Sequence, residues 1–232
     1  MQQAQPRGIS RRRVEKLLLK TKSHRSAANR IDVLSRHFLG HRYETNPLIG
    51  SSDTPEVFTA SLDGFDCVTY IETILALANS TTADDFAKWL RKIRYEEGHI
   101  EWMRRNHYMS GWIRSNAKAG IVRLVSMPSQ ATVTRARELN VVAGLAPQRV
   151  RVKCVRKPVI HRIEPSLKTG DLIFFASTRK NLDIFHCGIL VRNGKRLLMR
   201  HASRSRGGVI EQDLDEFLRA NRMSGVIVVR PT

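Results

Sequence analysis

Apolar positions near the start of the chain recur with the period of an α-helix. Val14, Leu17 and Leu18 lie on one face of an otherwise basic segment, which predicts an amphipathic helix. A second helix is predicted over about 26–38, where apolar residues again share a face. Gly40 is its expected stop, because glycine favours the conformation that ends a helix.

A strongly apolar helix is predicted directly after Asp66. From Cys67 onward the apolar residues follow the helical period through Val68, Ile71, Ile74, Leu75 and Ala78. Asp66 carries a side chain suited to the N-cap position. The pattern therefore places Cys67 in the first turn of a buried helix.

The last third of the chain has the pattern of an antiparallel sheet. Asn193-Gly194 between two strand-like runs is a strong hairpin signal. The runs predict a strand over 169–178, hairpin arms over 184–191 and 195–203, a helix over 214–222 and a closing strand over 225–231. Together with the upstream helices, these elements predict an α+β fold in which helices pack on an antiparallel sheet.

The middle of the chain is less regular and is interpreted as a helical and mixed insertion between the Cys67 helix and the last sheet. It holds a predicted helix near 83–94, an aromatic cluster and basic strand-like runs. The expected organisation is a basic N-terminal arm or helix (1–30), a helical half of the core (31–80), the insertion (81–165) and the sheet half of the core (166–232).

The net charge is more informative about possible partners than the overall composition. The hydrophobic fraction of 41% is ordinary for a globular protein, but 40 Lys and Arg against 21 Asp and Glu give a net charge of +19. Residues 1–30 carry nine Lys or Arg and one acid, Glu15. Such a field attracts polyanions, whether nucleic acid, anionic lipid or acidic polymers of a cell envelope, without choosing among them.

Three cysteines and no Cys-X-X-Cys pair predict neither a disulfide framework nor a zinc knuckle, so no metal or other cofactor is expected. No apolar run approaches the ~18 residues that suggest a membrane span. The first residues hold only a short apolar run where an export signal needs a core of roughly 7–15 residues. We therefore expect no such signal here, and leave open both the cell envelope and the cytoplasm as the compartment. Oligomeric state is not readable.

Hairpin geometry relates two histidines. If Asn193 and Gly194 are the two turn residues, His186 directly faces His201 across the ladder. Directly opposed residues have Cβ atoms ~4.5–5.5 Å apart and point to the same side of a sheet. The spacing therefore predicts two imidazoles side by side, in which one orients the other.

The same alternation of strand faces distinguishes Cys187 from Cys67. Period two puts Cys187 on the face opposite His186, among Phe185 and Ile189, where a buried small hydrophobic residue is expected. Cys67 remains as the candidate nucleophile. A helix start and an adjacent imidazolium both lower a thiol pKa, whereas a neighbouring carboxylate acts mildly against the thiolate.

Cys67, His186 and His201 can thus supply nucleophile, base and orienting group. Two alternatives stay open. His201 could merely cap the sheet edge while Asp183 or another polar group orients His186. The same three side chains could bind zinc, although no close-spaced ligand pair supports such a site.

At this point the chain resembles a known family. The segments "FLGHRY" (38–43), "LDGFDCVTYIETILALA" (62–78), "RYEEGHI" (94–100), "RRNHYMSGW" (104–112), "GDLIFFAST" (170–178), "HCGILV" and "RHAS" occur in an order similar to the NlpC/P60 superfamily of papain-like cysteine peptidases and amidases, in its DUF1460 branch. The resemblance implies a papain-like core and cleavage of the amide between N-acetylmuramic acid and L-alanine in peptidoglycan.

The resemblance also implies roles for particular residues. Cys67 matches the nucleophile, His186 the base and His201 the third catalytic residue, while Tyr43 matches an aromatic beside the nucleophile. A segment similar to this branch's substrate-cleft insertion adds candidate substrate contacts, which with Asp66 are His107, Tyr108 and Trp112. Aromatic packing is the alternative reading of the last three. The chain departs from the pattern at His41-Arg42, where the family usually has Thr-Pro before the tyrosine.

The leading hypothesis is therefore a cysteine amidase that acts on peptidoglycan or muropeptides. An endopeptidase that cuts within the stem peptide, or acyl transfer by the same residues, would use the same core. A basic nucleic-acid-binding protein is the alternative from a different class, although aromatic residues make up only 6% and no RNA-binding or zinc-finger signature is present.

Overall fold

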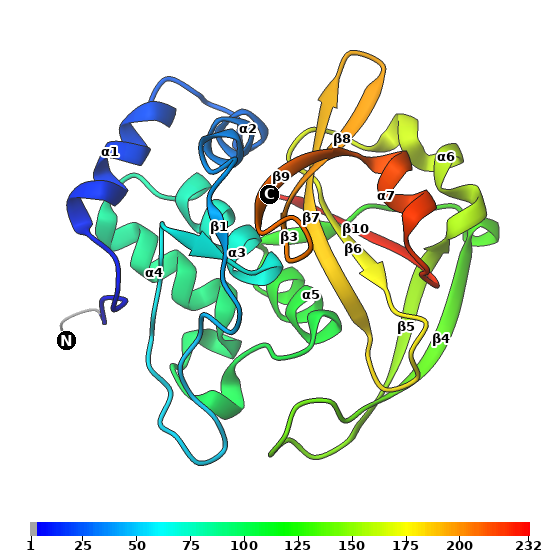
Figure 1. The fold of residues 1–232 in the computed structure, drawn as a ribbon, viewed down its shortest axis with the longest axis horizontal. Helices are drawn as coiled ribbons and strands as arrows, with labels where there is room; N and C mark the ends of the chain where they lie inside the picture. The colour runs from blue at the N-terminus through cyan, green and yellow to red at the C-terminus, as the bar shows by residue number, and fades with distance from the viewer. Residues whose placement is uncertain (1–3) are drawn as a thin grey trace.

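A curled, mostly antiparallel sheet with helices on both faces forms the fold in the computed structural model, which describes residues 4–232 (Figure 1). Its α-helices are α1 Arg11–Thr21, α2 Ala27–His37, α3 Cys67–Ala78, α4 Ala83–Arg94, α5 Met109–Lys118, α6 Ile160–Ile163 and α7 Leu214–Ala220. Short 3₁₀ turns include η1 Glu96–Gly98 and η2 Trp102–Arg104. None of the helices in residues 4–232 combines the length and apolar surface needed to cross a membrane.

The strands occur in the sheet order β2-β1-β9-β8-β7-β6-β10-β5-β4, and β3 pairs with β10 outside this path. Their bounds are β1 Arg42–Tyr43, β2 Gly64–Phe65, β3 Val122–Leu124, β4 Thr132–Leu139, β5 Gln148–Arg156, β6 Leu172–Ala176, β7 Ile184–Asn193, β8 Arg196–Ser203, β9 Gly208–Asp213 and β10 Gly225–Pro231. The predicted helix-on-sheet α+β arrangement is present as a mixed α/β fold.

Alternation along β6 explains why both sheet faces are covered. Phe174 packs into the larger core, which α1 to α5 share with one face of the sheet. Phe175 packs into a second core beneath α6 and α7 on the other face. Because successive strand residues point to opposite sides, an unbroken apolar run is what a strand buried on both faces requires.

The helices at the start of the chain form where the apolar pattern predicts them. Val14, Leu17 and Leu18 of α1 are buried in the main core, so this basic segment is a packed helix and not a free arm. The start of α2 is capped by Ser26, whose hydroxyl accepts a hydrogen bond from the Asn29 amide. Such a cap satisfies one of the backbone donors that a helix start leaves unpaired.

Segment 81–165 belongs to the same sheet and core as the rest of the chain. Its helices α4 and α5 contribute to the main core, and its strands β3 and β5 pair with β10 at the end of the chain. The segment interpreted as an insertion is therefore integrated into both layers.

The hairpin forms, but its predicted register is wrong by two residues. Asn193 stays in the ladder opposite Arg196, so Gly194 and Lys195 are the turn residues. Gly194 has φ +58°, and it occupies the first central position, where a type II′ turn requires glycine. His186 and His201 are consequently diagonal neighbours and are not directly opposed. A shift of two does not by itself move a side chain to the other face, because the side-chain period is two.

A β-bulge in β7 corrects a second expectation. Phe175 pairs with His186 and Ala176 pairs with Ile184, which leaves Phe185 as the extra residue. Phe185 was expected beside Cys187, but it packs against the second core, while Cys187 lies in the main core. Bulges re-aim side chains in this way, and they are common next to active sites.

A buried polar cluster joins three helices behind the sheet. The Arg94 guanidinium donates to Glu72 Oε2 at 2.7 Å, and both side chains are 2% exposed. Trp112 Nε1 donates to the other oxygen of Glu72 at 3.2 Å. A single carboxylate on α3 therefore fixes both α4 and α5.

We expect Glu72→Gln to destabilise the fold by about 3–5 kcal/mol, because it leaves the Arg94 charge buried without its counter-ion. Chemical denaturation measures the free energy of unfolding. The matched control is Glu138→Gln, whose partner Arg149 is 90% exposed and whose loss should cost less than about 1 kcal/mol. Equal losses in the two variants would contradict the assignment.

Candidate active site

The first turn of α3 is built to present Cys67 at a helix N-terminus. Asp66 is the N-cap: its carboxylate accepts from the Thr69 amide at 2.7 Å, and the Asp66 amide donates to the Thr69 hydroxyl. This capping box fixes the direction in which the helix starts. The predicted N-cap and the predicted position of Cys67 are confirmed as structural features.

Cys187 is a neighbour of Cys67 that the alternation pattern alone did not reveal. Its thiol donates to the Cys67 carbonyl oxygen at 3.2 Å from within the main core. The expectation that Cys187 is a buried small residue holds, since it is 1% exposed. This contact forms only because α3 packs against β7, and no short-range pattern in the sequence predicts that packing.

The two thiols have opposite electrostatic preferences. Hydrogen bonding from the Cys187 thiol, followed by the hydrogen bond and charge of the His186 imidazole, lowers the pKa of Cys67 well below its ordinary value. Burial, followed by the hydrogen bond to Cys67, raises the pKa of Cys187 well above its ordinary value. Of the two thiols, Cys67 is therefore the one whose surroundings favour the thiolate, and Cys187 is the one whose surroundings favour the protonated form.

His186 and His201 are in direct contact despite the shifted register. His186 Nε2 lies 2.7 Å from His201 Nδ1, with the rings nearly perpendicular. Phe175 and Phe217 both lie beside the His186 ring, at interplanar angles of 19° and 25° to it, and their own ring centroids are 4.5 Å apart. Aromatic packing thus fixes the plane of the His186 ring, and the contact with His201 fixes the direction of its Nε2 atom.

Burial makes His201 the neutral member of the pair. His201 is 2% exposed, and burial, with the nearby His186 charge, lowers its pKa to about 3. His201 can consequently act as the hydrogen-bond acceptor of the pair through Nδ1. With His186 Nε2 directed at His201, its Nδ1 is the nitrogen left for Cys67.

Asp183, the alternative orienting group, has other partners. Its carboxylate accepts from the Ile184 amide and from the Ser110 amide, each at 2.7 Å. It therefore ties the first turn of α5 to the start of β7. His201 is the group hydrogen bonded to His186.

Two further residues border the nucleophile. Tyr43 is half-buried against the main core, and burial, together with the nearby Cys67 charge, raises its pKa. Burial and the Cys67 charge also raise the pKa of Asp66 to about 6. Both pKa shifts therefore arise in part from the nearby Cys67 sulfur.

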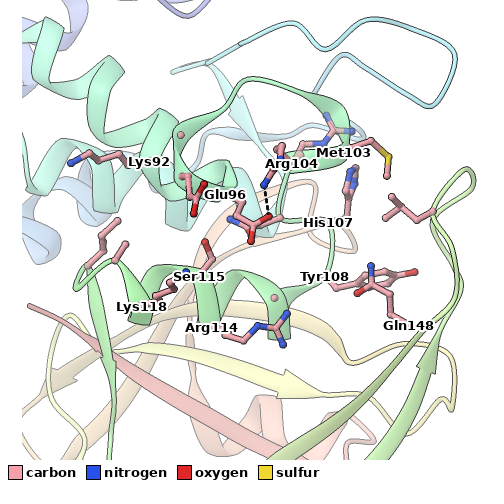
Figure 2. A pocket seen from close by; sticks show the side chains of 18 of the residues that line it. Lys92, Glu96, Met103, Arg104, His107, Tyr108, Arg114, Ser115, Lys118 and Gln148 are labelled. Carbon is pink, nitrogen blue, oxygen red and sulfur yellow. Dashed lines mark hydrogen bonds and ion pairs between the residues drawn. The ribbon is translucent and has the colours of Figure 1, made fainter.

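The three aromatic candidates of segment 104–112 separate in the structure. Trp112 is fully buried between Glu72 and Phe174, so the expectation that it contacts substrate is wrong. His107 and Tyr108 line a cavity of about 640 Å³ (Figure 2). The helical period places a tryptophan on the core face as readily as on the open face, which is why the sequence did not separate them.

Within residues 4–232, no cluster of three or more His, Cys, Asp or Glu side chains is arranged to hold a metal ion. The zinc alternative for Cys67, His186 and His201 therefore has no geometric support in the described part of the chain.

Solved structures share this fold. A protein of Legionella pneumophila assigned to DUF1460 is 19% identical with a TM-score of 0.84, and the match covers 95% of this chain and 94% of that one. An N-acetylmuramoyl-L-alanine amidase from Bacteroides uniformis is 24% identical with a TM-score of 0.79, covering 89% and 99%. A protein of Bacteroides fragilis described as a putative xylanase is 25% identical with a TM-score of 0.73, covering 84% and 98%.

No curated protein sequence matches the chain. The sequence profile of the AmiA-like family, described as N-acetylmuramoyl-L-alanine amidase-like, matches residues 33–226 and thus includes Cys67, both histidines and the sheet that carries them. The chain therefore belongs to this AmiA-like family of amidase-like proteins.

Proposed function

We propose that the protein is a cysteine amidase that cleaves the bond between N-acetylmuramic acid and L-alanine in peptidoglycan or its fragments. The observation that carries the proposal is the placement of Cys67, at a helix N-terminus, beside an imidazole whose far nitrogen lies 2.7 Å from a buried second imidazole. Membership of an amidase-like family supports the choice of an amide substrate.

The resting state is a thiolate paired with an imidazolium. The Cys67 proton resides on His186 Nδ1, and the Nε2 proton of His186 is donated to Nδ1 of the neutral His201. A positive helix end and an adjacent cation both favour the anionic sulfur. The neighbouring Cys187 thiol, which is hydrogen bonded to the Cys67 backbone, also lowers the pKa of Cys67.

The reaction begins with attack of the Cys67 thiolate on the lactyl carbonyl of the muramic acid. The backbone amide of Cys67, at the start of α3, is positioned to donate to the developing oxyanion. His186 transfers its proton to the leaving amine of L-alanine, and a thioester remains on Cys67. Water, deprotonated by His186, then releases the acid and restores the thiolate.

Cys67→Ala removes the nucleophile and should abolish hydrolysis, while the fold remains because Cys67 is only partly buried. Mass spectrometry of digested muropeptides is the measurement. The wild type should release N-acetylmuramic acid and an intact stem peptide. Residual turnover in the variant would contradict the thiol mechanism, and cleavage inside the stem peptide by the wild type would contradict the assigned bond.

Cys187→Val should make Cys67 a weaker thiolate, because it removes the thiol donor that contributes most to lowering the Cys67 pKa. The pH dependence of Cys67 alkylation by iodoacetamide should move to higher pH. On the part of the pH profile where the rate rises with pH, the rate at a given pH should fall roughly threefold to tenfold, since one pKa unit is a tenfold change.

The control for this variant is Cys154→Val, which removes a buried thiol of β5 and should leave the alkylation profile of Cys67 unchanged. An unchanged or acid-shifted profile in Cys187→Val would show that Cys187 only fills space.

A further inference from the structure

A small pocket lies where α1 meets α2 and the loop that follows α2 (Figure 1). Its volume is about 240 Å³, which suits a small ligand. Cys67, His186 and His201 are not among its lining residues. Among the described residues that line it, none is an aspartate or a glutamate, and five carry basic side chains: Arg13, Lys16, Lys20, His37 and His41.

The protein neutralises only part of the positive charge around this pocket. Arg13 pairs with Asp63, whose carboxylate lies 2.7 Å from the guanidinium. Lys16 and Lys20 are exposed, and neither is in an ion pair within the part of the chain that the structure describes. α2 ends at His37, and the carboxyl end of a helix contributes only about half a negative charge. Most of the charge of the two lysines is therefore left for an anion to balance.

His37 lies among these positive charges as a neutral hydrogen-bonding group. Lys20 Nζ lies 2.9 Å from His37 Nδ1. Because an ammonium group can only donate, Nδ1 accepts, and the proton of the neutral ring lies on Nε2. Burial, followed by the charges of Lys20, His41 and the other cations of the pocket, lowers the pKa of His37. The ring therefore has a donor for an anion, and an anion beside it would relieve the repulsion that acts on it.

His41 is held in place by its own backbone. The Val209 amide of β9 donates to the His41 carbonyl oxygen at 2.7 Å, and the His41 amide donates to the Phe38 carbonyl oxygen at 3.0 Å. The buried Phe38 ring contacts the His37 and His41 rings edge-on, at centroid distances of 5.1 and 5.0 Å. The histidine wall of the pocket is therefore pre-formed. One of its two imidazoles also distinguishes this chain, because His41 stands where the DUF1460 pattern usually has threonine.

We propose that this pocket binds a phosphate group, either as free inorganic phosphate or as the phosphomonoester of a small molecule. A phosphate dianion balances the charges of Lys16 and Lys20, and its oxygens can accept several charge-assisted hydrogen bonds at once. A carboxylate has one negative charge and two oxygens, so it leaves more of the positive charge unbalanced. The site does not depend on the proposed reaction, since it contains none of the groups assigned to it.

Proton NMR of the full-length protein tests the proposal, because each histidine gives its own ring signals. Inorganic phosphate and glycerol 3-phosphate are titrated separately at one fixed pH and ionic strength. The His37 and His41 signals should shift to saturation, whereas those of the exposed His99 and His161 should not move. The bound anion should also raise the pKa of His37, because an adjacent negative charge favours the imidazolium. Tighter binding of glycerol 3-phosphate supports a phosphomonoester as the ligand, and tighter binding of inorganic phosphate supports the free anion.

Lys20→Ala and His41→Thr should each raise the Kd for phosphate about threefold to tenfold, as expected for loss of a hydrogen-bond partner. Lys22→Ala is the matched control, since Lys22 is an exposed cation directly after α1 that does not line the pocket. Its Kd should equal that of the wild type. Acetate is the comparison anion and should bind roughly tenfold more weakly than phosphate, because it offers fewer charge-assisted hydrogen bonds.

Three results would overturn the proposal. The first is a set of His37 and His41 signals that neither phosphate compound shifts to saturation. The second is a Kd for Lys20→Ala and His41→Thr that matches the Kd of Lys22→Ala. The third is equal affinity for phosphate and acetate, which would indicate only the general attraction of anions to a basic protein.

Discussion

The contact between the first turn of α3 and strand β7 is the constraint on which the site depends. The Cys187 thiol of β7 donates to the Cys67 carbonyl, so the helix start cannot move along the strand without losing a buried hydrogen bond. That contact brings a residue near the beginning of the chain to a pair of histidines more than a hundred positions later. Every chemical property assigned to Cys67 follows from this placement.

A buried charge next to the histidine pair also maintains the placement of the helices on the sheet. Arg200, 2% exposed, donates to Asp32 and Ser35 of α2 and to Glu211 of β9. It precedes His201 on β8, so the helical layer is attached to the sheet immediately beside the proposed orienting histidine. Removing one partner of such a network leaves an uncompensated charge, which costs about 3–5 kcal/mol, whereas the intact network adds little net stability. Its contribution is to fix one arrangement of helix on sheet.

Periodicity was sufficient to predict α1 to α4, α7, the hairpin and the meeting of His186 with His201, because each depends on local spacing. It did not predict α5 or α6. It could not predict the bulge at Phe185 or the turn at Gly194-Lys195, since both depend on how the strand ends fit their neighbours. Trp112 was misassigned for a related reason: a helix shows which residues share a face, but not which face meets the core. The Cys67–Cys187 contact and the cavity lined by His107 and Tyr108 arise only when segments distant in sequence pack together.

Burial also determines that His201 is the imidazole that stays neutral. Because the pKa of His201 falls from an unfolded value of 6.5 to about 3, the folded protein holds this ring neutral where the unfolded chain would protonate it. The resulting stability is present above pH 6.5 and is lost as the pH falls toward 3. A neutral His201 adds no positive charge to the pair and leaves a ring nitrogen free to accept a hydrogen bond. The desolvation that makes this ring sensitive to acid therefore also keeps it in the neutral form that can accept a hydrogen bond from His186.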